Sequence, residues 1–102
     1  MSEISVLEKT RISTTTNSKK TRVIMHNDDT TSFEVVIFIL CNVFKKTESE
    51  AFMIALSIHN SGPNGKKVIA EYPKSIALAK VNKALQIAKD EGYPNFKITT
   101  LD

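Results

Sequence analysis

One three-residue cluster near the start of the chain carries side chains that could do chemistry. Asn27, Asp28 and Asp29 are consecutive and follow the apolar run Val23–Met25. Asn and Asp side chains bond backbone groups two residues further on, so the cluster predicts a turn. Its amide and carboxylate oxygens could also accept hydrogen bonds from a cation such as a primary ammonium group. The cluster is therefore either a simple turn or an acceptor site.

His59 is a second candidate, far from the first in sequence. It lies four residues after Ala55, near the end of an expected helix, so the two side chains share one side of that helix. A histidine on a mostly apolar face is more often a packed core residue. A neutral imidazole nevertheless offers an acceptor nitrogen. If the turn faces His59, three acceptors could surround an ammonium group, and protonation of His59 in mildly acidic solution would weaken its binding.

Catalytic and metal sites find little support in the sequence. Cys41 lies within an apolar run, and the glycines form no phosphate-binding motif. No serine has the setting of a nucleophile elbow. His26, Asp28 and His59 could act as acid, base or metal ligands, but their spacing matches no zinc motif. We expect no enzyme and no cofactor, and keep a small enzyme or metal-binding domain built on these three residues as the alternative.

Composition restricts the classes of protein. A chain of 102 residues with 41% hydrophobic residues suits one domain without a membrane span. The net charge of +3 is shared: residues 1–20 carry four basic and two acidic side chains, and the remainder is nearly neutral. RNA binding through the pairs Lys45-Lys46 and Lys66-Lys67 is thus a weaker alternative. The single cysteine fits a reducing compartment, so we expect a cytoplasmic protein. We also expect a monomer that binds neither nucleic acid nor membrane.

The remaining pattern predicts the elements that would position these residues. Residues 1–20 are rich in Thr, Ser and Lys and are expected to be a disordered extension, and 21–102 to be the domain. Thr31 and Glu34 have the spacing of a capping box, as do Thr47 and Glu50. The expected order is strand 22–26, helix 32–44, helix 47–60, strand 66–72, a helix from Pro73 ending before Gly92, and strand 95–101. This is an α+β fold with the order β-α-α-β-α-β.

The first expected helix is unusual because it is apolar on every side. Its central residues, Val35–Leu40, are all apolar, and β-branched and aromatic types dominate among them. Such a helix is either fully buried or presents an apolar face as a site. Full burial is difficult in so small a domain, so a partly exposed apolar groove is expected beside the turn.

Three segments together resemble the ClpS family of adaptors, which deliver N-degron substrates to a Clp AAA+ unfoldase and its peptidase. They are Val23–Thr31, Ala51–His59 and Ala77–Val81, and the resemblance extends over about residues 21–95. It implies three helices on a small three-stranded antiparallel sheet. It also implies substrates that begin with Leu, Phe, Tyr or Trp, and a ClpA- or ClpC-type N-terminal domain as partner.

The resemblance assigns roles to particular positions. The substrate's free α-amino group would be received by Asn27, Asp28 and His59. Its large N-terminal side chain would enter a pocket lined by Asp29, Thr31, Phe33, Val36, Ala55 and Ile58. Lys80 matches a lysine on the surface that faces the unfoldase, and the extension at residues 1–20 matches a segment that the unfoldase engages.

Two departures from the family pattern bear on specificity. Phe33 and Ala55 occupy pocket positions where the family often has methionine, so one wall is bulkier and the other smaller. The segment after Pro94, with Asn95 and Phe96, differs from the usual Leu-Leu run. Whether either of these residues closes the pocket is left open by the sequence.

Overall fold

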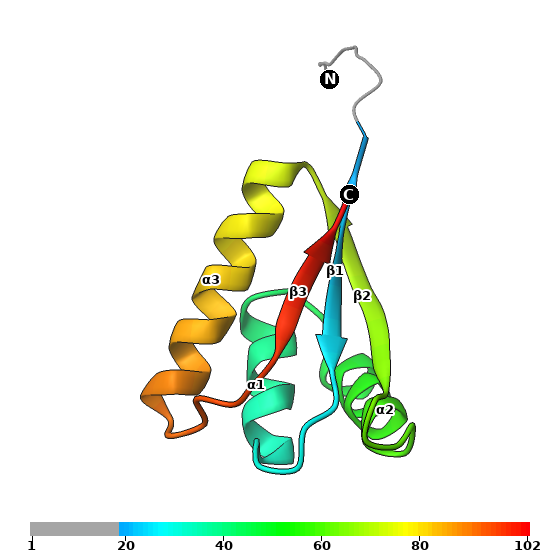
Figure 1. Cartoon of the computed structure of the whole chain (residues 1–102), viewed down its shortest axis with the longest axis vertical. Coiled ribbons are helices and arrows are strands. Elements are labelled where there is room, and N and C mark those ends of the chain that lie inside the picture. Colours follow the sequence, from blue (N-terminus) through cyan, green and yellow to red (C-terminus); the bar gives the residue numbers. More distant parts are fainter. Residues whose placement is uncertain (1–18) are drawn as a thin grey trace.

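The chain folds around a three-stranded antiparallel sheet with the order β2-β1-β3. The computed structural model describes residues 19–102, so the expected disordered extension falls outside the described residues except for its last two positions. The strands are β1 (Thr21–His26), β2 (Lys66–Tyr72) and β3 (Ile98–Leu101), and the helices are α1 (Phe33–Asn42), α2 (Glu48–His59) and α3 (Lys74–Asp90) (Figure 1). The expected α+β class, element order and antiparallel sheet are confirmed.

The middle strand β1 divides its side chains between the core and the outer face of the sheet. Val23 and Met25 are 0% and 1% exposed, whereas Arg22 and the alternate positions after it are more accessible. Val23 of β1 lies opposite Ala70 of β2, and Ile24, the next residue of β1, lies opposite Val68. Ile69 is therefore the extra residue of a β-bulge, and its side chain is buried.

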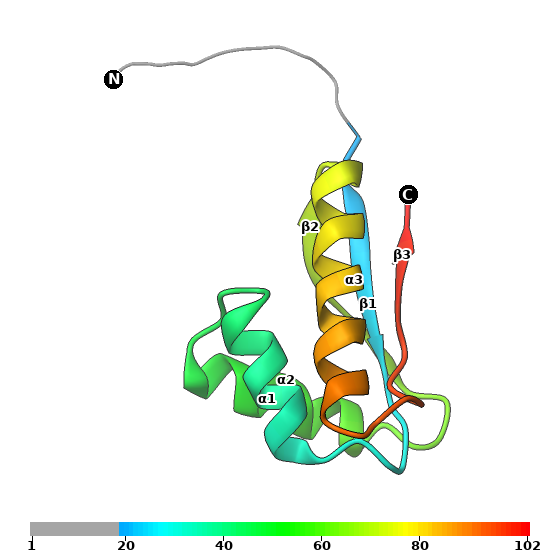
Figure 2. The same ribbon diagram turned by 90° about the vertical axis from the view of Figure 1, so that its left-hand side faces the viewer.

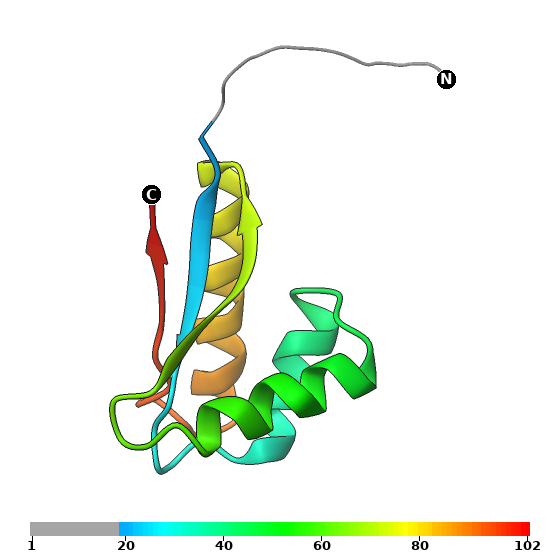
Figure 3. The same ribbon diagram turned by 90° about the vertical axis from the view of Figure 1, so that its right-hand side faces the viewer.

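The helices cover the core side of the sheet in two units. α3 runs along the sheet, and α1 and α2 form a hairpin at the end where β1 finishes (Figures 2 and 3). The buried positions of α3 recur at intervals of three and four residues, and they are Ala77, Val81, Ala84 and Ala88. Because three of these four are alanine, the helix backbone can lie close to the sheet. The apolar α1 buries Ile39 and Leu40 but leaves Phe38 52% exposed, so it is only partly covered.

Local capping signals predicted most helix ends correctly, with one error. The Thr47–Glu50 capping box is present at the start of α2. Gly92 follows the C-cap of α3 with φ of 91°, as expected for a residue that must be left-handed. At α1, however, the cap is Ser32, whose hydroxyl accepts a hydrogen bond from the Val35 N–H, so the expected capping box beginning at Thr31 is wrong.

Several boundaries also differ from the prediction, by one to three residues. α1 ends at Asn42, earlier than the expected 44, and Pro73 is the N-cap of α3 rather than its first helical residue. β3 begins at Ile98 instead of 95, because the backbone N–H of Phe96 bonds the Tyr93 carbonyl in a turn and the Phe96 side chain enters the core.

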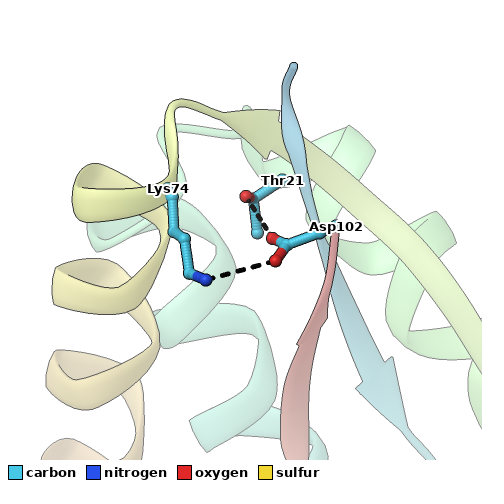
Figure 4. A network of polar contacts seen from close by, with 3 residues as sticks. All are labelled: Thr21, Lys74 and Asp102. Carbon is cyan, nitrogen blue, oxygen red and sulfur yellow. Dashed lines mark hydrogen bonds and ion pairs between the residues drawn. The ribbon is translucent and has the colours of Figure 1, made fainter. Parts of the chain in front are cut away.

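A polar latch joins the strand ends to α3 at the end of the sheet opposite the α1–α2 hairpin. The Thr21 hydroxyl donates to Asp102 Oδ1 at 2.7 Å, and Lys74 Nζ donates to Asp102 Oδ2 at 3.2 Å (Figure 4). These two hydrogen bonds and the Lys74 charge lower the pKa of Asp102 below its ordinary value of 3.8. The carboxylate therefore holds together the start of β1, the end of β3 and the start of α3.

We expect the Asp102→Asn variant to have a lower free energy of unfolding than the wild type at neutral pH. A carboxylate with a lowered pKa stabilises the fold fully above 3.8, and this contribution is lost as the pH falls through the folded-state value. Urea denaturation at neutral and strongly acidic pH should thus show a difference between the two proteins that disappears in acid. The control is Asp90→Asn, since Asp90 accepts from the neutral amide of Gln86. A pH-independent difference would contradict the role of the Asp102 charge.

Candidate functional site

A narrow cavity lies where β1 ends, α1 begins and α2 ends, at the lower end of the sheet in Figure 1. Its volume is about 40 Å³, well below the roughly 300–1,000 Å³ of most ligand pockets. It is lined by Met25, His26, Asn27, Asp28, Thr31, Phe33, Val36, Ala55, Ile58 and His59. Nine of these ten residues were site candidates from the sequence, His26 among them for the alternative function, so the fold brings together positions that lie more than thirty residues apart.

A wider hollow of about 360 Å³ lies outside the cavity. The two spaces share five residues, and these form the rim between them: Asn27, Asp28, Thr31, Phe33 and His59. Asp29 lines only the outer hollow, where it is exposed. The rim is thus mostly polar and the inner wall mostly apolar. This arrangement can hold a polar or cationic group at the mouth while an apolar group points inward.

The side chain of Asn27 is oriented by the loop that follows α2. Its Nδ2 donates to the Gly62 carbonyl at 2.7 Å, and its backbone N–H donates to the Gly65 carbonyl at 2.8 Å. A carbonyl can only accept, so the amide nitrogen must face Gly62, and Oδ1 accepts no hydrogen bond from residues 19–102. Gly65 has no room for a side chain, because an added Cβ would clash with Ser61. The loop therefore presents an acceptor at the rim.

Asp28 is an acceptor within the turn itself. Its Oδ1 atom accepts from the backbone N–H groups of Thr30 and Thr31 at 2.9 and 2.8 Å, and from both threonine hydroxyls. Oδ2 accepts from the Thr31 hydroxyl alone among residues 19–102, so it retains acceptor capacity. Burial raises the pKa of Asp28, but the hydrogen bonds from Thr31 and Thr30 outweigh it and leave the pKa below 3.8. The group is therefore an anion at neutral pH.

His59 sits at the last position of α2, and Phe33 sits at the first position of α1. Their ring centroids are 6.2 Å apart with an interplanar angle of 90°. Phe33 also contacts Phe52 edge to face, at 5.6 Å. These two contacts position the half-buried Phe33 ring on the rim. The His59 imidazole forms no hydrogen bond within the described part of the chain, so its nitrogens are available to a ligand.

The apolar wall of the cavity comes from three elements. Val36 of α1 and Ala55 and Ile58 of α2 occupy the expected positions. Met25 of β1, which sequence reasoning missed, completes the wall. The sequence signal that could have identified Met25 was the alternation of buried and exposed residues along the strand, which points its side chain toward the core two residues before Asn27. Asn95 is exposed, Phe96 is in the core, and neither lines the cavity.

Lys80, the expected partner-binding residue, lies on α3 away from the cavity. Its Nζ donates to the Val43 carbonyl at 2.8 Å and lies 5.2 Å from the centroid of the Tyr72 ring. Val43 is the C-cap residue of α1, where a cation compensates the partial negative charge of the helix end. The ammonium group is therefore already engaged in holding α1 against α3, at the edge of a groove of about 500 Å³.

His26, Asp28 and His59, the residues of the alternative function, all line the cavity. Among residues 19–102, no three His, Cys, Asp or Glu side chains lie close enough to hold a metal ion. Nε2 of the His26 imidazole is hydrogen-bonded to the Thr99 hydroxyl at 2.8 Å. Cys41 is partly buried and packs against the core. Within the same residues, no helix has both the length and the apolar character to cross a membrane.

Comparison with known proteins gives one consistent family. The family described as "ATP-dependent Clp protease adaptor protein ClpS" matches residues 16–96. The ClpS adapter of Clostridium acetobutylicum is 42% identical over 76 residues, which are 74% of this chain and 72% of that protein. The Helicobacter hepaticus ClpS adapter is 44% identical over 81 residues, or 79% of each chain.

A solved structure agrees with this result. It is that of Agrobacterium tumefaciens ClpS2 bound to L-phenylalaninamide, with a TM-score of 0.75 and 28% sequence identity. The likeness covers 83% of this chain and 98% of the other. Both the sequence and the fold of the described domain are therefore similar to those of ClpS proteins.

We expect Asp28→Ala to lower the free energy of unfolding by about 1 kcal/mol, because the N–H groups of Thr30 and Thr31 lose their acceptor. Asp28→Asn keeps a carbonyl oxygen and should cost less. Since the folded-state pKa of Asp28 is lowered, the advantage of the wild type over D28N should be present above pH 3.8 and fade in stronger acid. Urea denaturation of the three proteins measures this. Equal stability of all three would show that the turn does not depend on Asp28.

Proposed function

This chain belongs to the ClpS family of ATP-dependent Clp protease adaptors, and we propose that it binds protein substrates through a bulky hydrophobic N-terminal residue. In this proposal Asn27, Asp28 and His59 receive the free α-amino group at the rim. The N-terminal side chain enters the cavity between Phe33 and Ala55. The observation that carries the proposal is the union of a polar rim and an apolar wall in one small cavity.

The chemistry of the rim fits an ammonium group. A primary ammonium has three N–H donors, and its hydrogen bonds to acceptors are about twice as strong as neutral ones. Oδ1 of Asn27 and Oδ2 of Asp28 have acceptor capacity, and a neutral His59 imidazole would supply a third acceptor. Two carboxylates in the outer hollow, those of Asp28 and Asp29, also favour a cation there.

The apolar wall supplies the second half of the selectivity. Burial of a Leu, Phe or Tyr side chain would contribute about 1.5–3 kcal/mol. A lysine side chain offers only the ammonium group and an internal leucine only the apolar group. An N-terminal residue offers both at a fixed separation, so recognition of both selects the start of a chain.

The ligand of the A. tumefaciens relative has this combination. L-phenylalaninamide carries a free α-amino group, a phenylalanine side chain, and an amide in place of a carboxylate, as in the first residue of a peptide. The cavity here is too narrow for such a side chain as it stands, so binding requires movement of a wall residue. We assign this movement to Phe33, because its half-buried ring lies on the rim and contacts Phe52 and His59 edge to face.

Delivery would use the face of α3 around Lys80. We assign the partner as the N-terminal domain of a ClpA- or ClpC-type unfoldase. The groove beside Lys80 contains Lys45, Lys83 and the exposed Ile76, so it offers both positive charge and apolar area to a partner. Lys80 itself would act by positioning this groove through its bond to Val43.

We expect peptides beginning with Phe, Leu, Tyr or Trp to bind, and the same peptides to lose binding when N-acetylated, because acetylation removes the ammonium charge and its donors. Asn27→Ala should weaken binding about tenfold or more. Fluorescence anisotropy with labelled peptides measures both effects. Peptides beginning with Ile or Met test how Phe33 and Ala55 shape the preference.

The matched control is Asn82→Ala, which removes an exposed asparagine on α3. It should leave peptide affinity unchanged. Equal binding of free and acetylated peptides would overturn the α-amino role of the rim. Failure of every free N-terminus to bind would overturn the proposed substrate class while leaving the family membership intact.

Delivery has its own test. Addition of the protein to a Clp unfoldase–peptidase should accelerate degradation of a fluorescent protein that begins with Phe, and should leave the same protein beginning with Ala unaffected. Loss of fluorescence over time reports the rate. Asn27→Ala should abolish the acceleration, since the substrate is no longer held. Acceleration of both fluorescent proteins would show that delivery does not read the N-terminus.

A further inference from the structure

A second cleft begins at the same residues as the candidate site and has the opposite charge. It has a volume of about 270 Å³, and its walls include His26, Asn27, Asn64, Lys66 and Lys97. His26 and Asn27 also line the apolar cavity, so the two spaces adjoin at the end of β1. Lys66 and Lys97 have no part in the proposed amino-group site.

Two lysines flank the end of β1 from both neighbouring strands. Lys66 lies directly opposite His26 on β2, and Lys97, just before β3, accepts the His26 backbone N–H through its carbonyl at 3.1 Å. Both lysine side chains are exposed. Among residues 19–102, the ion pair found joins Lys74 to Asp102, so no carboxylate of these residues neutralises Lys66 or Lys97.

The surroundings of His26 report the positive potential in this cleft. Its pKa is lowered from 6.5, first by burial and then by the charges of Lys97 and Lys66. The nearby amide of Asn64 supplies further donors without adding charge. Lys66 and Lys97 lie on either side of β1 and line the same cleft, so a carboxylate in the cleft would be attracted by both charges. The cleft therefore suits a carboxylate.

The position of the cleft identifies which carboxylate. A peptide held by its α-amino group at Asn27 places each later residue at most about 3.3–3.6 Å further along the chain. Its second to fourth residues can thus reach the walls formed by Lys66 and Lys97. The outer hollow, which also includes Asn27, contains Asp28 and Asp29 and would repel an acidic residue. The two charged regions would therefore sort substrates by the charge that follows the N-terminal residue.

We propose that Lys66 and Lys97 form a subsite that selects N-degrons with Asp or Glu at the second to fourth positions. This inference rests on the proposed function. It adds to it a charge preference set by residues outside the amino-group site and the apolar cavity.

The test compares three peptides that share an N-terminal Phe and differ at positions two to four, which are acidic, neutral or basic. At low salt the acidic peptide should bind about threefold to tenfold more tightly than the neutral one, and the basic peptide most weakly. Because exposed charges are screened over about 3 Å at 1 M salt, the discrimination should vanish there. Anisotropy titrations measure each affinity.

In the variant K66A/K97A the acidic peptide should bind no better than the neutral one, and the acidic residues of the outer hollow should even disfavour it. The control R22A/K89A removes two exposed basic side chains outside the cleft and should keep the preference. The same affinity for acidic and neutral peptides in the wild type would overturn the subsite while leaving the proposed function standing. An N-acetylated acidic peptide that binds as well as the free one would also overturn it, since the lysines would then be a separate anion site.

Discussion

The way in which the chain leaves β1 is the constraint on which the candidate site depends. Asn27 is fixed by the loop after α2 through a backbone and a side-chain hydrogen bond. The Asp28 carboxylate then accepts hydrogen bonds from the backbone N–H groups of Thr30 and Thr31. Together these bonds determine where α1 begins and which atoms are left to accept a ligand. Asp28 both stabilises the turn and lines the cavity, so its substitution would affect the stability of the turn as well as ligand binding.

The same junction places an apolar wall next to polar acceptors. α1 is apolar on all sides, and a domain with one sheet and three helices cannot bury every side of it. The side toward α2 becomes the wall of the cavity, through Val36 opposite Ala55 and Ile58. Phe33, at the start of α1, contacts His59 at the end of α2, so one aromatic ring lies between the wall and the rim. The apolar wall that would bind a side chain and the polar rim that would bind an amino group therefore adjoin between α1 and α2.

Charge is distributed unevenly around Asn27 although the domain is nearly neutral overall. Asp28 and Asp29 line the outer hollow, whereas Lys66 and Lys97 line the basic cleft, and Asn27 lines both. Net charge alone reveals neither region, because opposite charges cancel in the sum. Separation of the charges matters for a binding protein, since a ligand that spans both regions experiences each of them in turn.

The sequence by itself determined the features that depend on neighbours within about four residues. The Thr47–Glu50 capping box, the left-handed Gly92 and the bounds of β2 agree with the structure, because their hydrogen bonds or steric limits are local. The element order followed from these signals. The family resemblance named the amino-group and pocket positions, and the fold brings them to one cavity and its outer hollow.

Only the tertiary structure decided the features that join distant segments. Lys80 donates a hydrogen bond to the Val43 carbonyl, and Asn27 donates one to the Gly62 carbonyl. Both bonds join residues more than thirty positions apart, so no local sequence pattern predicts them. The basic cleft combines side chains from positions 26, 66 and 97, and the width of the cavity depends on how Phe33 packs. Such properties arise from distances across the fold, which sequence spacing alone does not specify.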